Sequence, residues 1–235
     1  MLVIESGLTL VDPSHARIGY RDVTEVYSAT SSAVQRPARS AKSWQTYERW
    51  QGGTSPATLT AEFSEAQIDY IGIGAHTLSR ADTYTAQVRV DGTWETVASG
   101  SVSDDGSLMI LITPRQSTGV RVTVSWSGVQ APEIGKLAAG LVLVIGRPLY
   151  GGHVPAALVR DTDRRQHISE RGEWLGAAVT LAGRSTQLAW SNLRADWYRF
   201  YFDAFAGHAK QYPFFLAWRP DRFAESVYAY ATGEI

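Results

Sequence analysis

The side chains that could carry out chemistry are present, but they do not form a recognisable catalytic pattern. Five histidines are scattered without an H-E-x-x-H motif or an i, i+4 pair: His15, His76, His153, His167 and His208. No G-x-S-x-G motif occurs, and spacing selects no glycosidase pair among the available glutamates: Glu48, Glu62, Glu95 and Glu133. The chain has no cysteine, which excludes thiolate ligands and cysteine nucleophiles. We therefore expect a protein that is not an enzyme and holds no metal or cofactor.

Two further patterns have an architectural interpretation. The glycine pair in Ile71-Gly-Ile-Gly lacks the third glycine of a dinucleotide-binding loop, and no amphipathic helix follows it. It is more typical of a strand against which another element packs closely. Asp104-Asp-Gly and Asp161-Thr-Asp do not have the EF-hand ligand spacing, so they are interpreted as turns.

Three large rings, Trp44, Tyr47 and Trp50, lie in the polar segment Arg36–Ser55. Pro37 and the Gly52-Gly53 pair favour a long loop over a helix. Burial of these rings at the open end of a sandwich is the favoured interpretation. The alternative is carbohydrate binding, in which exposed rings stack on sugars.

The elements that position these residues are mostly strands. Thr58–Phe63, Ile68–Ala75, Tyr84–Val90, Thr93–Val97, Leu108–Ile112, Val120–Trp126 and Leu141–Ile145 are alternating or apolar runs of strand length. Asp91-Gly92 between two of them is a strong hairpin signal. Short strands joined by turn residues, almost without helix, predict a mainly β fold with a β-sandwich over residues 1–148.

A second, smaller α+β domain is predicted for residues 149–235, after the break at Gly146-Arg-Pro148. The expected strands are Gly172–Leu181, Thr186–Trp190, Pro213–Trp218 and Ser226–Ala231, with Pro213–Trp218 at an edge. One aromatic-rich helix is expected with Trp197, Tyr201 and Phe205 on one face. So many rings in so small a unit suggest contacts with another subunit, since aromatic and arginine side chains concentrate at interfaces. The expected interface residues are Arg194, Arg199, Phe214, Phe215, Trp218, Arg219 and Arg222.

Composition limits the possible partners. Forty-four per cent of the residues are hydrophobic and 19% are charged, as in folded globular proteins, and the formal net charge is −1. This balance does not have the basic character of a nucleic-acid-binding protein. The N-terminus meets Glu5 too early for a signal peptide, and no apolar run is long enough to span a membrane.

Residues 25–148 resemble the discoidin-type, galactose-binding-like jelly rolls. The residues that carry this resemblance are Ser43-Trp44, Ala61–Ser64, Ile68–Ile73, Val90–Trp94 and Val120–Val124. The resemblance implies ligand-binding loops at one end of the sandwich. The cysteine pair usual in that family is absent.

The last 85 or so residues are similar to tail-tip proteins of long-tailed phages, especially the distal tail protein and related minor tail proteins. The matching segments are Glu170–Gly172, Leu188–Leu193, the aromatic helix, Pro213–Trp218 and Val227–Tyr230. Those proteins form rings that connect the tail tube to the hub and receptor-binding parts. Here the sandwich precedes the supposed ring-forming part, the reverse of their usual order.

The resemblance implies a virion structural protein at the tail tip, assembled in the host cytoplasm. Its expected partners are further copies of the chain in a ring, a hexamer or a trimer, with the tail tube, hub and tape measure proteins. The alternative hypothesis is a carbohydrate-binding module that contacts host surface glycans through the sandwich.

Overall fold

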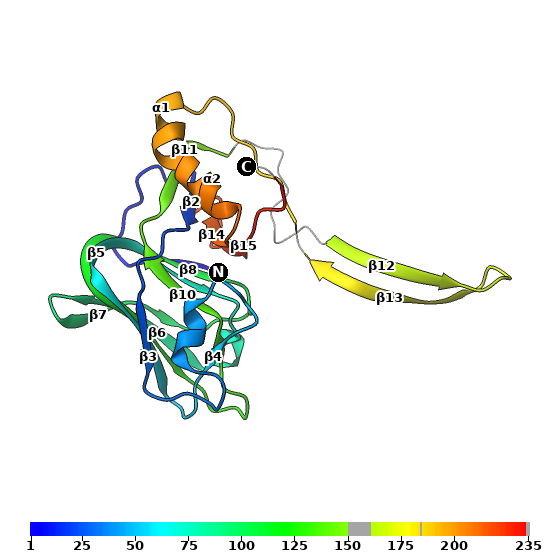
Figure 1. The fold of residues 1–235 in the computed structure, drawn as a ribbon, viewed down its shortest axis with the longest axis horizontal. Coiled ribbons are helices and arrows are strands. Elements are labelled where there is room, and N and C mark those ends of the chain that lie inside the picture. The colour runs from blue at the N-terminus through cyan, green and yellow to red at the C-terminus, as the bar shows by residue number, and fades with distance from the viewer. Residues whose placement is uncertain (150–160, 184, 234–235) are drawn as a thin grey trace. The chain divides into compact units, whose positions relative to one another are not determined.

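The computed structural model describes residues 1–149, 161–183 and 185–233, and it is mainly β (Figure 1). The mainly β prediction is therefore confirmed.

The chain forms two compact units: Met1–Pro148 together with Leu193–Ile235, and Leu149–Asn192. The predicted break after Pro148 coincides with an edge of the first unit. The predicted second domain, 149–235, is not one unit, because its last part belongs with the sandwich.

The larger sheet has seven strands in the order β10-β5-β8-β6-β7, with β1 added to β8 and β3 to β5. Its strands are β1 (Leu2–Ile4), β3 (Val26–Ala29), β5 (Ala57–Gly74), β6 (Thr83–Val90), β7 (Thr93–Gly100), β8 (Leu108–Ser125) and β10 (Lys136–Gly140). The predicted hairpin joins β6 to β7, with positive φ at both turn residues, Asp91 and Gly92.

The long strands β5 and β8 let this sheet enclose a core. Their register shifts between Glu62 and Ala66, and such irregularities bend strands. One end of β5 pairs with β3 and the other with β10. Side chains from both ends, such as Leu59 and Ile71, consequently lie in the same hydrophobic core.

A second sheet has the order β11-β2-β14-β15. Its strands are β2 (His15–Gly19), β11 (Leu143–Pro148), β14 (Phe214–Ala217) and β15 (Val227–Ala229). β14 is an inner strand between β2 and β15, so the prediction of an edge strand was wrong. Its pairing partner β2 is almost 200 residues earlier in the chain, and nothing local in the sequence indicates that pairing.

The second sheet packs on the outer face of β5, β8 and β10 through a separate core that includes Tyr70 and Phe215. A Cβ on Gly72 would stand 2.5 Å from the Phe215 ring, and one on Gly74 would stand 3.0 Å from the Tyr228 ring. The close packing predicted for the glycine pair is confirmed, since only glycine leaves room for these rings.

The aromatic helix consists of α1 (Ala195–Trp197), the π-helical turn η3 (Tyr198–Phe202) and α2 (Asp203–Ala209). Phe202 and Phe205 are buried, whereas Tyr201 is half exposed. Phe205 packs edge-on against Phe214 of β14, with ring centroids 5.0 Å apart. The predicted face was partly wrong, because a π-helical turn accommodates an extra residue and rotates the following side chains.

The second unit contains the antiparallel hairpin β12 (Asp161–Ile168) and β13 (Trp174–Gly183). The predicted strand near Trp174 is confirmed. Asp161–Asp163 lies in β12 and is not a turn, and Thr186–Trp190 is not a strand. His153 lies outside the described residues.

The remaining elements are short: η1 (Ala38–Lys42), β4 (Trp50–Gln51), η2 (Leu78–Arg80) and β9 (Glu133–Ile134). β4 and β9 pair with each other. Among the described helices, none has the length and apolar character needed to cross a bilayer.

Candidate functional site

An open groove of about 1080 Å³ lies in the first unit, between the loop that follows η1 and the C-terminal segment around β15. Its walls bring together residues 42–47 with residues 211–213 and 228–230. The lining includes five aromatic side chains: Trp44, Tyr47, Tyr212, Tyr228 and Tyr230. The groove therefore depends on the return of the C-terminal segment to the sandwich.

Three of these rings are accessible to a ligand. Tyr47 and Tyr230 are each 72% exposed, and Tyr212 is 45% exposed. Polar side chains lie among them, including the exposed Gln45 and Gln211. The groove thus offers flat apolar faces beside groups that donate and accept hydrogen bonds.

Trp44 is held in place at the inner wall. Its ring stacks with that of Tyr228 at 8° between planes and 6.3 Å between centroids. The Tyr228 hydroxyl donates a 3.0 Å hydrogen bond to the Trp44 carbonyl oxygen. The His208 ring meets the Trp44 ring edge-on at 5.1 Å. Strand β15 and helix α2 therefore both orient a ring that the loop contributes.

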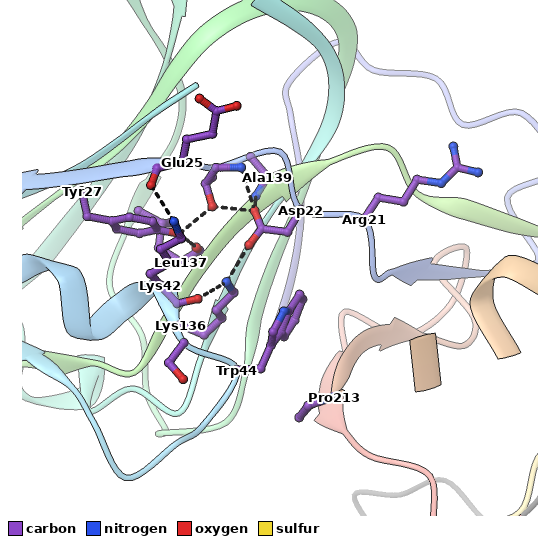
Figure 2. A network of polar contacts seen from close by, with 12 residues as sticks. Arg21, Asp22, Glu25, Tyr27, Lys42, Trp44, Lys136, Leu137, Ala139 and Pro213 are labelled. Carbon is purple, nitrogen blue, oxygen red and sulfur yellow. Dashed lines mark hydrogen bonds and ion pairs between the residues drawn. The ribbon is translucent and has the colours of Figure 1, made fainter. Parts of the chain in front are cut away.

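A buried ion pair lies beside Trp44 (Figure 2). The Lys136 ammonium group donates to Asp22 Oδ2 and to the Lys42 carbonyl oxygen, each at 2.6 Å. It also lies 4.3 Å from the centroid of the Trp44 ring, within the range of a cation–π interaction. Burial lowers the pKa of Lys136, and the attraction of Asp22 opposes that change.

The carboxylate of Asp22 is fixed by further donors. Its Oδ1 accepts from the backbone nitrogen of Thr24 at 3.1 Å and from the Thr24 hydroxyl at 2.6 Å. The Thr24 hydroxyl also lies 2.6 Å from that of Tyr27, which donates to the Leu137 carbonyl oxygen. This network ties the segment before β3 to β10 and makes the inner wall rigid.

The predicted carbohydrate-binding residues have different surroundings. Trp44 and Tyr47 line the groove. Trp50 is completely buried in the sandwich core, and its Nε1 donates to the Ser32 hydroxyl at 3.1 Å. Its assignment to a binding site was therefore wrong, because β4 turns this ring inward.

Sequence reasoning missed the C-terminal side of the groove. Tyr228 and Tyr230 are two residues apart, and this spacing puts side chains on one face of a strand. This spacing was the signal available in the sequence, but it did not indicate that the two tyrosines would lie opposite the loop of Trp44 and Tyr47.

The predicted interface residues also separate into two groups. Phe214, Phe215 and Trp218 are buried within the chain, so their assignment to a subunit interface was wrong. The four arginines remain at least partly accessible: Arg194, Arg199, Arg219 and Arg222.

Other groups with possible chemistry are isolated. His76 is buried, and this burial lowers its pKa to about 4. Within residues 1–149, 161–183 and 185–233, no three acidic or histidine side chains gather as a metal site requires.

No protein-family model matches the chain, and no curated protein matches it. Similar solved structures include chitosan-binding module 1 of a chitosanase/glucanase from Paenibacillus sp. IK-5, with 20% identity and a TM-score of 0.46. The family 32 carbohydrate-binding module of NanJ from C. perfringens, in complex with galactose, has 18% identity and a TM-score of 0.45. These two likenesses cover 51% and 52% of this chain and 98% of each module. A pectin-binding carbohydrate-binding module has 15% identity and a TM-score of 0.44, over 51% of this chain and 91% of that one.

Proposed function

We propose that this protein binds carbohydrate in the groove between Trp44 and Tyr230, without catalysing a reaction. The observation that carries the proposal is the gathering of exposed tyrosines around a wide cavity. Soluble proteins rarely leave such rings together on the surface unless the surface binds something. In this protein the exposed tyrosines surround a cavity and do not form a flat patch.

The chemistry of the groove suits a sugar ring. One face of a pyranose presents C–H groups, which pack on the electron-rich face of an aromatic ring. Its hydroxyl groups need partners that both donate and accept hydrogen bonds, and Gln45 and Gln211 supply amides that do both. A purely apolar ligand would form no hydrogen bond with these amides, although the Gln45 amide oxygen already accepts one from the Tyr47 hydroxyl at 2.8 Å.

The size of the groove favours an oligosaccharide over a single sugar. Its volume of about 1080 Å³ is at the upper limit of common small-molecule pockets, roughly 300–1000 Å³. It is also open, so a chain could extend past its ends.

The rigid inner wall supports the same function. Trp44 is fixed by Tyr228 on one element and by Lys136 on another. A platform held in this way loses little conformational entropy when a ligand binds, which favours affinity.

A titration of the purified protein with a glycan panel, followed by tryptophan fluorescence, tests the proposal. Tyr212→Ala and Tyr47→Ala should each weaken binding about 5- to 30-fold, as expected for about 1–2 kcal/mol from a lost stacking ring. Phe223→Ala is the control, since this exposed ring does not line the groove. Absence of binding, or equal losses in all three variants, would refute the proposal.

A second candidate function is assembly in a phage tail tip, which the similarity of the C-terminal segments to tail-tip proteins suggests. One structural observation favours a subunit contact: Phe200 is 79% exposed on the aromatic helix, beside the exposed Tyr198, Arg199 and Tyr201. In this proposal the chain forms a ring with its own copies and joins the tail tube to the hub.

Light scattering at increasing protein concentration tests assembly. A ring should form, and Phe200→Asp should dissociate it, because a carboxylate in an apolar contact is strongly unfavourable. A monomer at all concentrations would dispose of self-assembly without affecting the carbohydrate proposal.

A further inference from the structure

A second, smaller cavity of about 280 Å³ shares a lining residue with the groove. Tyr47 lines both the groove and the small cavity. Three arginines also line the small cavity, Arg36, Arg39 and Arg49, with Glu48 as the one acidic side chain among its lining residues. The small cavity therefore carries a net positive charge beside an aromatic surface.

Two of the three guanidinium groups have no partner within the described residues. Arg36 and Arg39 make no side-chain hydrogen bond or ion pair with any residue in the described part of the chain. Arg36 is nevertheless half-buried. A partly buried cation without a partner is unfavourable, so an anion in this cavity would be stabilised by groups already in place.

Arg49 is positioned differently. Its Nε donates to the Thr46 carbonyl oxygen at 3.2 Å, and its Nη1 lies 3.4 Å from Glu133. These contacts fix the loop that carries Tyr47. Arg49 thus holds the wall that separates the two cavities, and Arg36 with Arg39 supply the free donors.

Guanidinium groups favour planar or tetrahedral oxyanions, because their parallel N–H bonds match two oxygens at once. A carboxylate and a sulfate ester share this chemistry. Both occur as substituents of sugars, and a chain that stacks on Tyr47 in the groove would place its next residue toward the arginines.

We propose that the arginine-lined cavity binds a carboxylate or sulfate group of the glycan whose sugar rings occupy the groove. The ligand class is therefore an acidic polysaccharide. This inference rests on the carbohydrate-binding function proposed above.

The test is a glycan array that includes pairs with the same sugar backbone, differing only in one carboxylate or one sulfate. Wild-type protein should prefer the acidic member of a pair at least about tenfold, which corresponds to about 1.4 kcal/mol. The carboxylated and the sulfated pairs distinguish the two sources of negative charge.

The double variant R36Q/R39Q should lose this preference and bind the acidic and neutral members equally. Arg80→Gln is the matched control, because Arg80 is an exposed arginine that lines neither cavity. The preference should also decline as salt is added, since exposed charges are screened. Thermal unfolding of each variant establishes that it is folded.

The experiment distinguishes failure of this inference from failure of the proposed carbohydrate function. Binding that is equal for acidic and neutral members, and unchanged in R36Q/R39Q, would overturn this inference and leave the carbohydrate function intact. Absence of binding to every glycan would overturn both. A preference that persists in R36Q/R39Q would assign the anion to another part of the groove and refute the role of these arginines.

Discussion

Replacement of Lys136 by methionine tests the reasoning about the inner wall most directly. The variant removes the ammonium group of a side chain that is only 1% exposed and leaves a side chain of similar length. It breaks the ion pair with Asp22, the hydrogen bond to the Lys42 carbonyl oxygen and the contact with the Trp44 ring.

The expected loss of stability depends on the groups that still surround Asp22 once the Lys136 ammonium group is removed. At an effective dielectric constant of about 20, opposite charges 2.6 Å apart attract by about 6 kcal/mol, and desolvation offsets part of this. Removal of one partner from a buried pair typically costs about 3–5 kcal/mol. Asp22 is 12% exposed and keeps its two hydrogen bonds from Thr24. We therefore expect the free energy of unfolding to fall by about 3 kcal/mol, the lower end of this range.

Urea unfolding followed by tryptophan fluorescence measures this loss, with an unchanged m-value as the sign of an intact fold. Adding Asp22→Asn to Lys136→Met removes the unpaired charge and should recover about 2 kcal/mol, which a double-mutant cycle reveals. The control is Lys42→Met, which removes an exposed lysine at the same groove and should change stability by less than about 1 kcal/mol. A loss below about 0.5 kcal/mol in Lys136→Met, or strict additivity in the double variant, would refute the role of the pair.

Three further predictions concern stability. Gly72→Ala should cost about 1–3 kcal/mol in urea unfolding, because its Cβ would stand 2.5 Å from the Phe215 ring; adding Phe215→Leu should reduce that cost, and an unchanged cost would contradict the steric explanation. Trp50→Ala should lower the free energy of unfolding by about 3–5 kcal/mol, as expected for a completely buried ring, and a near-neutral effect would show that the ring is not part of the core. The pH dependence depends on two buried groups with opposite effects. Burial lowers the pKa of His76 from 6.5 to about 4, so the unfolded state is protonated first and about 3 kcal/mol of stability is lost as pH falls through this window. Burial raises the pKa of Asp69 from 3.8 to about 6, so the folded state is protonated first and a similar amount is gained as pH falls from about 6 to 3.8. Urea unfolding at several pH values should show His76→Asn becoming more stable on acidification and Asp69→Asn becoming less stable; parallel profiles for wild type and both variants would exclude this explanation.

Local features of the sequence were sufficient for much of the architecture. The Asp91-Gly92 hairpin could be predicted because two adjacent residues supply the backbone conformation that the turn requires. The strands of the sandwich could be predicted because alternation of apolar residues is a property of consecutive positions. Close packing at Gly72 could also be predicted, since a glycine within a strand indicates a close neighbour, although the sequence did not identify that neighbour as Phe215.

The candidate site could be predicted only in part. Trp44 and Tyr47 were recognised as potential ligand-stacking residues, and the structure places both at the groove. Trp50 has the same spacing and composition around it but is buried. Ring type and position are therefore insufficient, since exposure depends on which elements cover each ring.

Only the tertiary structure places the C-terminal wall of the groove opposite the loop of Trp44. β14 pairs with β2, and this long-range pairing carries Tyr212, Tyr228 and Tyr230 to the loop of Trp44. The buried pair of Lys136 and Asp22 joins positions 114 residues apart. Contacts of this kind depend on the packing of whole sheets, and packing energies are sums over many distant residues, so no local window of the sequence contains them. Residue type and local spacing account for the strands and turns, whereas the groove and the orientation of its rings exist only because the C-terminal segment folds back onto the sandwich.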